Sequence, residues 1–270
     1  MADNDQAEAQ PNRDDDLLYE KTGHVATITF NRPHARNAMT YAMYDGLCDA
    51  CERVDSDDDV RVLVLRGAGE KAFVAGTDIS QFRSLRTADD ALAYEARMDR
   101  VVGRLEAVKK PAIAAIHGYA VGAGAMLAIT CDLRLCTPDA QFGVPIARTL
   151  GNVLSIANHS RLIDLLGPAR TKDLIFTARM IDADQALALG LATEVVPADR
   201  FEARLTELAT TLASHAPLTL RTTKEAIRRI QAQRRGPPSD DLILACYLSD
   251  DFHEGVQAFL EKRRPEFNGR

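Results

Sequence analysis

The segment from Lys110 to Asp132 (KPAIAAIHGYAVGAGAMLAITCD) constrains the fold more than any other part of the chain. A short apolar run leads through a glycine-rich turn into a second apolar run of helical length. Gly118, Gly122 and Gly124 allow the main chain to adopt positive φ or to approach another group closely. The first N–H groups of a helix have no acceptor inside that helix, and they favour negative charge nearby. The segment therefore predicts a strand, a turn and a helix that present main-chain N–H groups to a ligand.

A second segment has the same order of features. The apolar strand predicted at Val62 to Leu65 is followed by the turn AFVAGTDI, which runs from Ala72 to Ile79. Two such turns can direct their main-chain N–H groups at a single oxygen atom.

The rest of the chain predicts short strands that alternate with helices. Residues 17–31 read as a β-hairpin that turns at Thr22-Gly23, and Thr40 is a favourable N-cap for the helix that follows. Further elements are expected as a strand at 61–66, a helix at 88–108, a strand at 112–116, a helix at 123–130 and short strands near 133–136 and 141–142. Beyond Gly151 the pattern is almost entirely helical, with glycine and proline breaks. This alternation predicts an α/β fold.

The charge of the chain is concentrated at its beginning. The 270 residues, 46% of them hydrophobic, are enough for a substantial core, and their formal net charge is −6. Residues 1–16 carry six acidic groups against Arg13, which leaves about −1 for the remainder. This first segment lacks apolar periodicity, so we expect it to be a disordered acidic tail. A near-neutral body without a basic stripe predicts no nucleic-acid partner.

The cysteines indicate a reducing environment. The chain has five, an odd number, and neither a signal peptide nor a long uncharged apolar run. We therefore expect a cytoplasmic protein without a membrane partner. Cys48 and Cys51 form a lone CxxC within an amphipathic helical pattern, where packing is the expected role, and no metal site is predicted.

Several motifs together resemble the crotonase family, also called the enoyl-CoA hydratase/isomerase family. AFVAGTDI, the segment KPAIAAIHGYAVGAGAMLAITCDLRL and AQFGVP carry the resemblance. NRPHARNAM (residues 31–39) is similar to the family's first loop, and FHEGVQAFLEKRRPEF (residues 252–267) is similar to its last helix. The matching segments lie in the family's order and cover residues 17–270.

The resemblance implies a fold and an assembly. The fold is a crotonase-like spiral of ββα repeats, expected over residues 17–200. Residues 201–270 then form a C-terminal helical region for oligomerisation, and the implied assembly is a homotrimer or a hexamer built as a dimer of trimers.

The resemblance also implies an acyl-CoA thioester as substrate, with coenzyme A as part of the substrate and no permanently bound cofactor. In the family, the thioester carbonyl oxygen lies between two main-chain N–H groups, an oxyanion hole that stabilises an enolate. By the family pattern these donors are Thr77, directly after Gly76, and Ala123, directly after Gly122. The alternative is that both glycine turns serve only close packing.

This chain departs from the hydratase pattern at two positions. The family's hydratases carry one glutamate at the start of the helix after the glycine turn and another after the proline of the QFGxP segment. Met126 and Ile146 occupy these positions and cannot transfer a proton. General acid–base groups each contribute about 10²- to 10⁴-fold, so we expect weak hydratase activity.

Three polar residues downstream are candidates to replace the missing carboxylates. Arg148 could hold a substrate carboxylate by paired hydrogen bonds, or it could point to solvent or to another subunit. His159 could act as a base near neutral pH, or it could be a packed histidine. Asn152 could contact the substrate or could be only a helix N-cap.

The resemblance also implies residues that contact coenzyme A. Arg36 lies in the loop past which the adenosine and pantetheine are expected to run, and Lys262 resembles a residue by which a neighbouring subunit contacts the nucleotide. For both cations the alternative is a solvated charge. The full predicted set is Ala35, Arg36, Ala75, Phe259 and Lys262.

These observations leave several functions open. The leading hypothesis is an acyl-CoA enzyme that stabilises an enolate, with decarboxylation of a carboxylated acyl-CoA as the preferred reaction, then double-bond isomerisation, then hydration. The alternative is a non-catalytic acyl-CoA-binding subunit. A dinucleotide-binding domain is excluded, because the third glycine of GxGxxG is replaced by Leu127.

Overall fold

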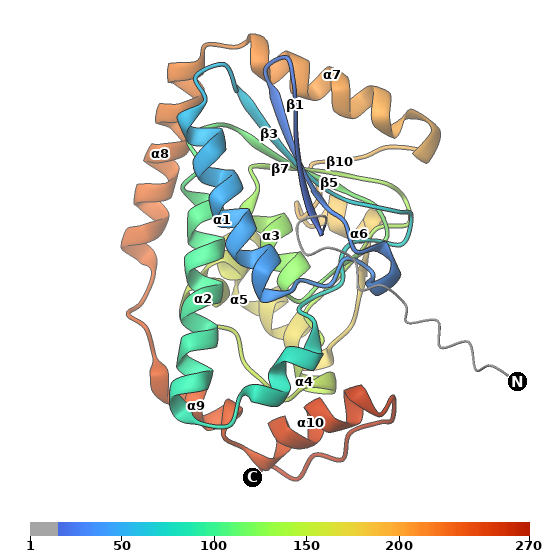
Figure 1. Ribbon diagram of the computed structural model, residues 1–270, viewed down its shortest axis with the longest axis vertical. Helices are drawn as coiled ribbons and strands as arrows, with labels where there is room; N and C mark the ends of the chain where they lie inside the picture. Colours follow the sequence, from blue (N-terminus) through green and yellow to red (C-terminus); the bar gives the residue numbers. More distant parts are fainter. Residues whose placement is uncertain (1–15) are drawn as a thin grey trace, which may run out of the picture.

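The computed structural model describes residues 16–270, in which two β-sheets are surrounded by helices (Figure 1). The expected tail at residues 1–16 lies, apart from Asp16, outside the described residues. None of the described helices is long and apolar enough to cross a membrane.

The larger sheet has six strands in the order β1-β2-β3-β5-β7-β10. β1 and β2 form the predicted antiparallel hairpin, and the remaining neighbours pair in parallel. The strands are β1 (Leu17–Thr22), β2 (Val25–Phe30), β3 (Val62–Gly67), β5 (Ala112–Ile116), β7 (Leu133–Cys136) and β10 (Glu194–Val195).

The smaller sheet has four strands in the order β4-β6-β8-β9. They are β4 (Ala72–Val74), β6 (Tyr119–Val121), β8 (Gln141–Gly143) and β9 (Ile181–Asp182). The parallel pairing of β4 with β6 is important for the site, because each of these strands leads directly into one of the glycine turns. Along the chain, pairs of strands recur with one strand in each sheet, and helices follow them. This order agrees with the predicted α/β fold.

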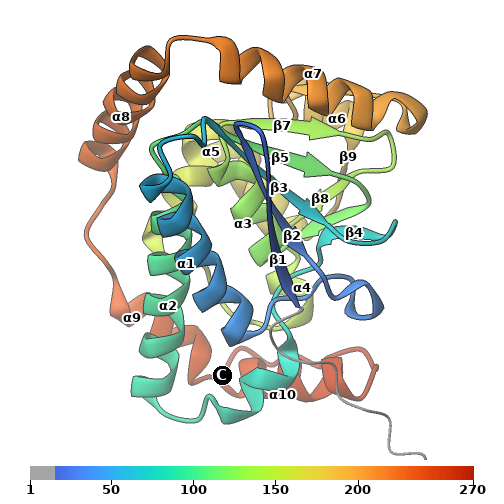
Figure 2. The same cartoon turned by 45° about the horizontal axis from the view of Figure 1, so that its top comes forward.

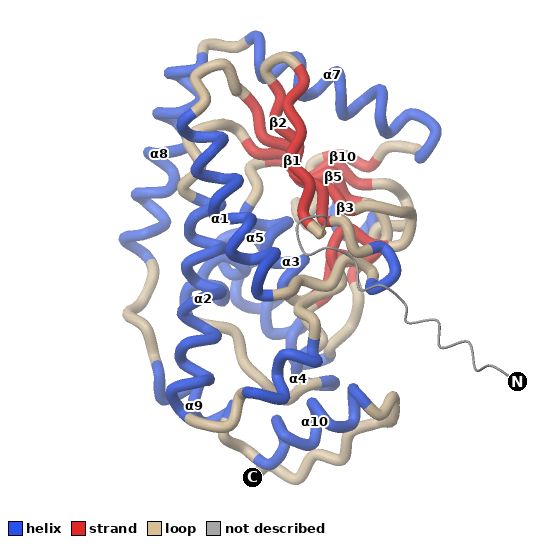
Figure 3. Tube along the Cα trace, in the orientation of Figure 1, coloured by secondary structure: helices blue, strands red, loops and turns tan. Residues whose placement is uncertain are grey.

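Ten α-helices and three short 3₁₀ helices connect and flank the described strands. In Figure 3 most helices lie to the left of and below the strands, and α7 lies above them. The first part of the chain contains η2 (Pro33–Ala35), α1 (Tyr41–Ser56), η3 (Ile79–Ser84), α2 (Ala88–Glu106), α3 (Ala123–Thr130) and α4 (Ile146–Thr149). The second part contains α5 (Ile156–Thr177), α6 (Ala183–Ala188), η4 (Ala198–Arg200), α7 (Phe201–Ser214), α8 (Pro217–Arg234), α9 (Asp240–Tyr247) and α10 (Asp250–Leu260).

The central strands are buried on both faces, which explains their continuous apolar sequences. In β3, Val62 and Val64 contribute to a small core with Phe201 and Leu205 of α7. The alternating residues Leu63 and Leu65 instead belong to the main core. Figure 2 shows α7 lying across the outer side of the six-stranded sheet, while α1, α2 and α3 lie on the other side.

Local signals account for the start of the helices that border the site. Thr40 caps α1 as predicted, by accepting a hydrogen bond from the N–H of Met43. Thr87 and Asp90 form a capping box at the start of α2. α2 then packs against α1, α3 and α9, so that one face of this long helix is directed into the interior of the molecule.

Two local features differ from the expectations. The C-terminal helical region has a break between α9 and α10 that was not predicted, because the side chain of Ser249 caps a new helix by accepting from the N–H of Phe252. Asn152 is not the N-cap of the helix that contains His159; Ser155 is, through the N–H of Asn158. The division of the chain into a core at 17–200 and an oligomerisation region at 201–270 stays a prediction.

Candidate active site

The two glycine turns lie in contact at the carboxyl ends of β4 and β6. Gly76 has φ 107° and Gly122 has φ 56°, conformations that favour glycine. A Cβ atom added to Gly122 would lie 3.7 Å from Cα of Gly76, and one added to Gly76 would lie 3.6 Å from the carbonyl oxygen of Val121. The parallel pairing of β4 with β6 thus brings together two turns that are far apart in the sequence.

The N–H groups that follow these glycines are unpaired within residues 16–270. The neighbouring amides are engaged: Asp78 N–H donates to the carbonyl of Met39, and Gly122 N–H donates to the carbonyl of Gly143, each at 2.9 Å. Thr77 N–H and Ala123 N–H have no acceptor among the described residues. Ala123 is the first residue of α3, where an unpaired N–H is expected.

Both residues line a cavity of about 160 Å³ whose walls are mainly apolar. The two glycines before the predicted donors, Gly76 and Gly122, and the two residues at the hydratase glutamate positions, Met126 and Ile146, are all in its lining, as expected of substrate-pocket residues. The other residues that surround it are Tyr44, Ala75, Thr77, Ile79, Phe82, Tyr94, Glu95, Met98, Val102, Val121, Ala123, Leu127, Pro145, Thr149, Leu150, Asn152, Leu154, Asn158 and Phe259. Such a cavity suits an acyl chain better than a charged group.

The side chain of Thr77 is held by two buried phenols. Its Oγ1 lies 2.7 Å from the hydroxyl of Tyr44 and 3.0 Å from that of Tyr94. Burial raises the pKa of both tyrosines above the ordinary value, so both stay neutral hydrogen-bonding groups at neutral pH. This cluster fixes the side chain of Thr77, while the main chain on either side of it is held by hydrogen bonds to Met39.

A carboxylate that the sequence analysis did not select also lines the cavity. Glu95 of α2 is only 5% exposed, and its Oε1 accepts a hydrogen bond of 2.5 Å from the hydroxyl of Tyr247 in α9. Burial raises the pKa of Glu95 to about 7; the hydrogen bond from Tyr247 opposes this shift, and the charge of Asp99 adds to it. The Tyr247 hydroxyl in turn accepts from Nδ2 of Asn152 at 3.1 Å.

A signal for Glu95 was present in the sequence. The apolar stripe of the helix contains Leu92, Met98 and Val102, and Glu95 is at helical spacing from Leu92 and Met98. A carboxylate inside an apolar stripe must be buried near a partner or a cavity. No comparable signal identified Tyr247, because its helix is distant in the sequence.

The three predicted polar candidates are placed differently. Asn152 lines the cavity, and its Oδ1 is buried without a hydrogen-bond partner among the described residues. Arg148 is exposed on α4 and is not among the described residues that line the cavity. His159 is on α5, also outside the lining, with its Nδ1 3.0 Å from the carbonyl oxygen of Ser155.

Of the predicted coenzyme A residues, Ala75 and Phe259 line the cavity, and the others lie outside its lining. Ala75 lines the cavity, and its N–H donates to the carbonyl of Arg36 at 3.1 Å, which ties the Ala35-Arg36 loop to the first glycine turn. The guanidinium of Arg36 lies 5.4 Å from the ring centre of Tyr119. Phe259 lines the cavity yet is 51% exposed, and Lys262 is exposed just beyond α10.

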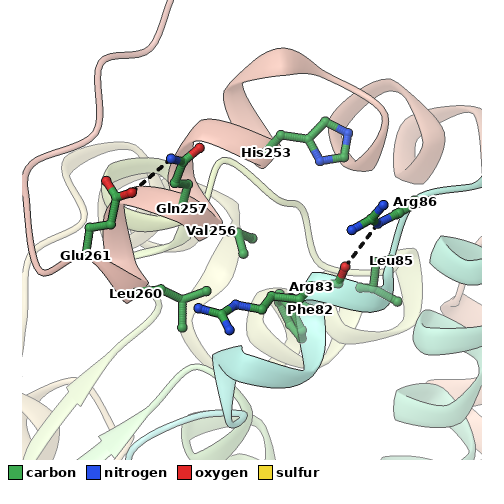
Figure 4. Close-up of a pocket in the computed structure, with 9 residues that line it drawn as sticks. All are labelled: Phe82, Arg83, Leu85, Arg86, His253, Val256, Gln257, Leu260 and Glu261. Carbon is green, nitrogen blue, oxygen red and sulfur yellow. Dashed lines mark hydrogen bonds between the residues drawn. The ribbon is translucent and has the colours of Figure 1, made fainter.

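A larger cavity of about 660 Å³ lies between η3 and α10 (Figure 4). Figure 4 shows Arg83 directed toward Leu260, and Arg86 directed toward the carbonyl of Arg83, to which its Nε donates at 3.4 Å. Phe82 belongs to the walls of both cavities. Neither glycine turn contributes to this second cavity, so the smaller one is the candidate active site.

Comparison with known proteins agrees with this geometry. The family model described as enoyl-CoA hydratase/isomerase matches residues 20–270. The chain belongs to this family. It is 36% identical over 259 residues to a short-chain-enoyl-CoA hydratase of Clostridium acetobutylicum, covering 93% of this chain and 96% of that relative.

Solved structures of family members share the fold. An enoyl-CoA hydratase/carnithine racemase from Magnetospirillum magneticum is 36% identical, with a TM-score of 0.78 and coverage of 95% of this chain and 96% of its own. A methylmalonyl-CoA decarboxylase in complex with 2-nitronate-propionyl-CoA is 29% identical, with a TM-score of 0.85 and coverage of 94% and 98%. Together they confirm the predicted crotonase-like fold. The prediction of an enoyl-CoA hydratase/isomerase-like enzyme that processes acyl-CoA substrates is likewise confirmed.

Proposed function

We propose that this enzyme binds an acyl-CoA thioester with its carbonyl oxygen between the N–H groups of Thr77 and Ala123 and stabilises the enolate formed there. One observation carries the proposal: the two glycine turns are in contact, and the residue after each, whose N–H has no acceptor among the described residues, lines the same apolar cavity. A preorganised donor of this kind contributes about 2.7 to 4 kcal/mol to transition-state stabilisation.

Hydration is not the efficient reaction of this enzyme. Addition of water to an enoyl thioester requires a proton to leave the water and another to reach the α-carbon. At the two positions where the family's hydratases carry glutamates, the cavity wall has Met126 and Ile146, which are 2% and 8% exposed. Loss of one acid–base group typically costs about 10²- to 10⁴-fold.

Decarboxylation of a carboxylated acyl-CoA is a second candidate, supported by the similarity to the methylmalonyl-CoA decarboxylase. Loss of carbon dioxide generates an enolate without a strong base, so the two N–H donors suffice for that step. Arg148 contributes little to this candidate within one subunit, because its exposed side chain is not among the described residues around the cavity.

The remaining features of the proposal come from the family resemblance. Coenzyme A runs past Ala35 and Arg36 to Ala75, Phe259 of the last helix flanks it, and Lys262 of a neighbouring subunit contacts the nucleotide. The subunits form a homotrimer or a dimer of trimers through the C-terminal helices. The alternative is a subunit that binds acyl-CoA without converting it.

Binding of an enolate mimic tests the proposal. The nitronate of 2-nitronate-propionyl-CoA is planar and negatively charged, as an enolate is, and propionyl-CoA is the matched ground-state ligand. We expect calorimetry to give at least about 100-fold tighter binding of the mimic, since transition-state analogues exceed substrates by 10²-fold or more. Equal affinities would refute enolate stabilisation, and crotonyl-CoA turnover at an ordinary hydratase rate would refute the assignment against hydration.

A further inference from the structure

Glu95 is the only residue with a carboxylate among the described residues that line the acyl cavity. It comes from α2, a helix that also contributes Tyr94, Met98 and Val102 to the lining. α2 packs against α3, whose first residue supplies the Ala123 N–H. Glu95 is therefore placed in the same small enclosure as both proposed oxyanion donors.

The surroundings of Glu95 hold one of its oxygen atoms and leave the other unengaged. Oε1 accepts the 2.5 Å hydrogen bond from Tyr247, while Oε2 accepts none from the residues that the structure describes. Tyr247 is itself oriented, because its hydroxyl accepts from Asn152 and must therefore donate to Glu95. This chain of contacts fixes the carboxyl group in one orientation beside the cavity.

The electrostatic environment suits a group that both accepts and donates a proton. Glu95 faces the hydroxyl of Tyr247 from α9 and the carboxylate of Asp99 one turn further along α2. The phenols of Tyr44 and Tyr94 also interact with Glu95, and no cation of the described residues is among the groups that shift its pKa. With a pKa of about 7, caused mainly by burial, the carboxyl is populated in both protonation states at neutral pH.

We propose that Glu95, on α2, is the proton-transfer residue of this site. The reaction it serves is the isomerisation that the family resemblance already implies, from 3-enoyl-CoA to conjugated 2-enoyl-CoA thioesters. This assignment rests on the proposed enolate stabilisation. Glu95 acts from α2, in place of the glutamates that the hydratases carry near the positions of Met126 and Ile146.

The reaction balances without any further reactant. The ionised Glu95 carboxylate takes a proton from C2 of the 3-enoyl thioester, and the electron pair of the broken C–H bond moves into a dienolate. The negative charge lies on the thioester oxygen, where the N–H groups of Thr77 and Ala123 stabilise it. The protonated Glu95 then returns the proton to C4, the double bond moves to C2–C3, and the carbonyl forms again. No water is consumed and nothing is oxidised.

The competing explanation is that Glu95 only anchors Tyr247 in the core. Glu95→Gln separates the two roles, because the amide keeps nearly the same shape and its oxygen can still accept from Tyr247, but it cannot accept a proton. Glu52→Gln is a matched control, since Glu52 is exposed on α1 away from the cavity. Tyr247→Phe removes the hydrogen bond that lowers the pKa of Glu95 and keeps the carboxylate.

The experiment measures three quantities on the full chain. They are conversion of 3-hexenoyl-CoA to the conjugated isomer by absorbance, deuterium uptake at C2 in D₂O by mass spectrometry, and the affinity for 2-nitronate-propionyl-CoA. We expect Glu95→Gln to lower conversion and deuterium uptake by about 10²- to 10⁴-fold. Its affinity for the nitronate should stay within about threefold, and Glu52→Gln should match the natural protein. Tyr247→Phe should move the rising limb of the pH–rate profile from near 7 to higher pH.

Each outcome gives a decision. Normal conversion by Glu95→Gln, or no conversion and no deuterium uptake by the natural protein, overturns the role of Glu95 even if the nitronate binds tightly. A loss of nitronate affinity in Glu95→Gln alone identifies a structural residue and also overturns it. If Glu95→Gln does not fold, the Tyr247→Phe profile decides, and an unmoved profile overturns the assignment. Failure of the natural protein to prefer the nitronate over propionyl-CoA instead refutes the proposed enolate stabilisation itself.

Discussion

Replacement of Gly122 by alanine is expected to damage the site through the backbone. Gly122 has φ 56° and ψ −117°, a combination that non-glycine residues avoid. The added Cβ would find ordinary contact, at 3.7 Å from Cα of Gly76, so the cost is conformational and not steric. Strain of this kind costs about 1–3 kcal/mol, and it is relieved by rotation of the peptide that carries the Ala123 N–H.

The consequence for catalysis follows from that rotation. Loss of one oxyanion donor corresponds to about 2.7–4 kcal/mol, or 10²- to 10³-fold in kcat. We expect Gly122→Ala to lose a similar factor in the preference for 2-nitronate-propionyl-CoA over propionyl-CoA. The melting temperature should fall by about 2–4 °C for each kcal/mol of strain.

Gly23→Ala is the matched control for this experiment. Gly23 also has φ 56°, in the hairpin turn between β1 and β2, and an added Cβ would have no neighbour within 4 Å. This variant should show a comparable loss of stability with unchanged affinity for the nitronate. The reasoning is refuted if Gly122→Ala and Gly23→Ala retain the same nitronate preference.

Three further predictions concern the walls and the frame of the site. Thr77→Val removes the hydrogen-bond partner of two buried phenol groups while keeping the main-chain N–H. It should lower the free energy of unfolding by about 1–3 kcal/mol in denaturant titrations and leave the nitronate preference intact. Loss of that preference would contradict the assignment of the donor to the backbone. Burial raises the pKa of Glu95 from 4.5 to about 7 in the folded protein, so the folded state binds the proton more tightly than the unfolded state does. The stability that this group contributes at low pH should therefore be lost as the pH rises from about 4.5 to about 7. The loss amounts to about 3 kcal/mol and should be absent from Glu95→Gln, and an identical pH dependence in both proteins would contradict this prediction. Glu106→Ala should destabilise the protein by about 3–5 kcal/mol in the same titrations, because it leaves Arg161 and Arg235 without the carboxylate that pairs with both. A change below about 1 kcal/mol would show that these two ion pairs are dispensable.

Much of the fold could be predicted from local signals in the sequence. The hairpin at residues 17–31, the helix that Thr40 caps and the helix at 123–130 are present as predicted, because glycine turns, caps and apolar periodicity act over a few residues. The division between α9 and α10 was missed, since Ser249 is a cap only if the chain turns there, which depends on packing.

The site could be predicted only where its chemistry lies in the backbone. The glycine turns predicted unpaired N–H groups at Thr77 and Ala123. The contact between the two turns follows from the pairing of β4 with β6. Side-chain candidates were sought close in sequence to Ile146, one of the two positions at which the family resemblance implies a glutamate in hydratases. That reasoning selected Arg148, which the structure leaves exposed, and overlooked Glu95, whose partner Tyr247 is 152 positions away.

A crystal structure of the complex with 2-nitronate-propionyl-CoA would locate the thioester oxygen relative to both glycine turns. If both main-chain donors bind it, this carbonyl oxygen lies about 2.7–3.1 Å from the main-chain nitrogen atoms of both Thr77 and Ala123. A carbonyl oxygen beyond hydrogen-bonding distance, about 3.5 Å, from either nitrogen would contradict binding by both donors.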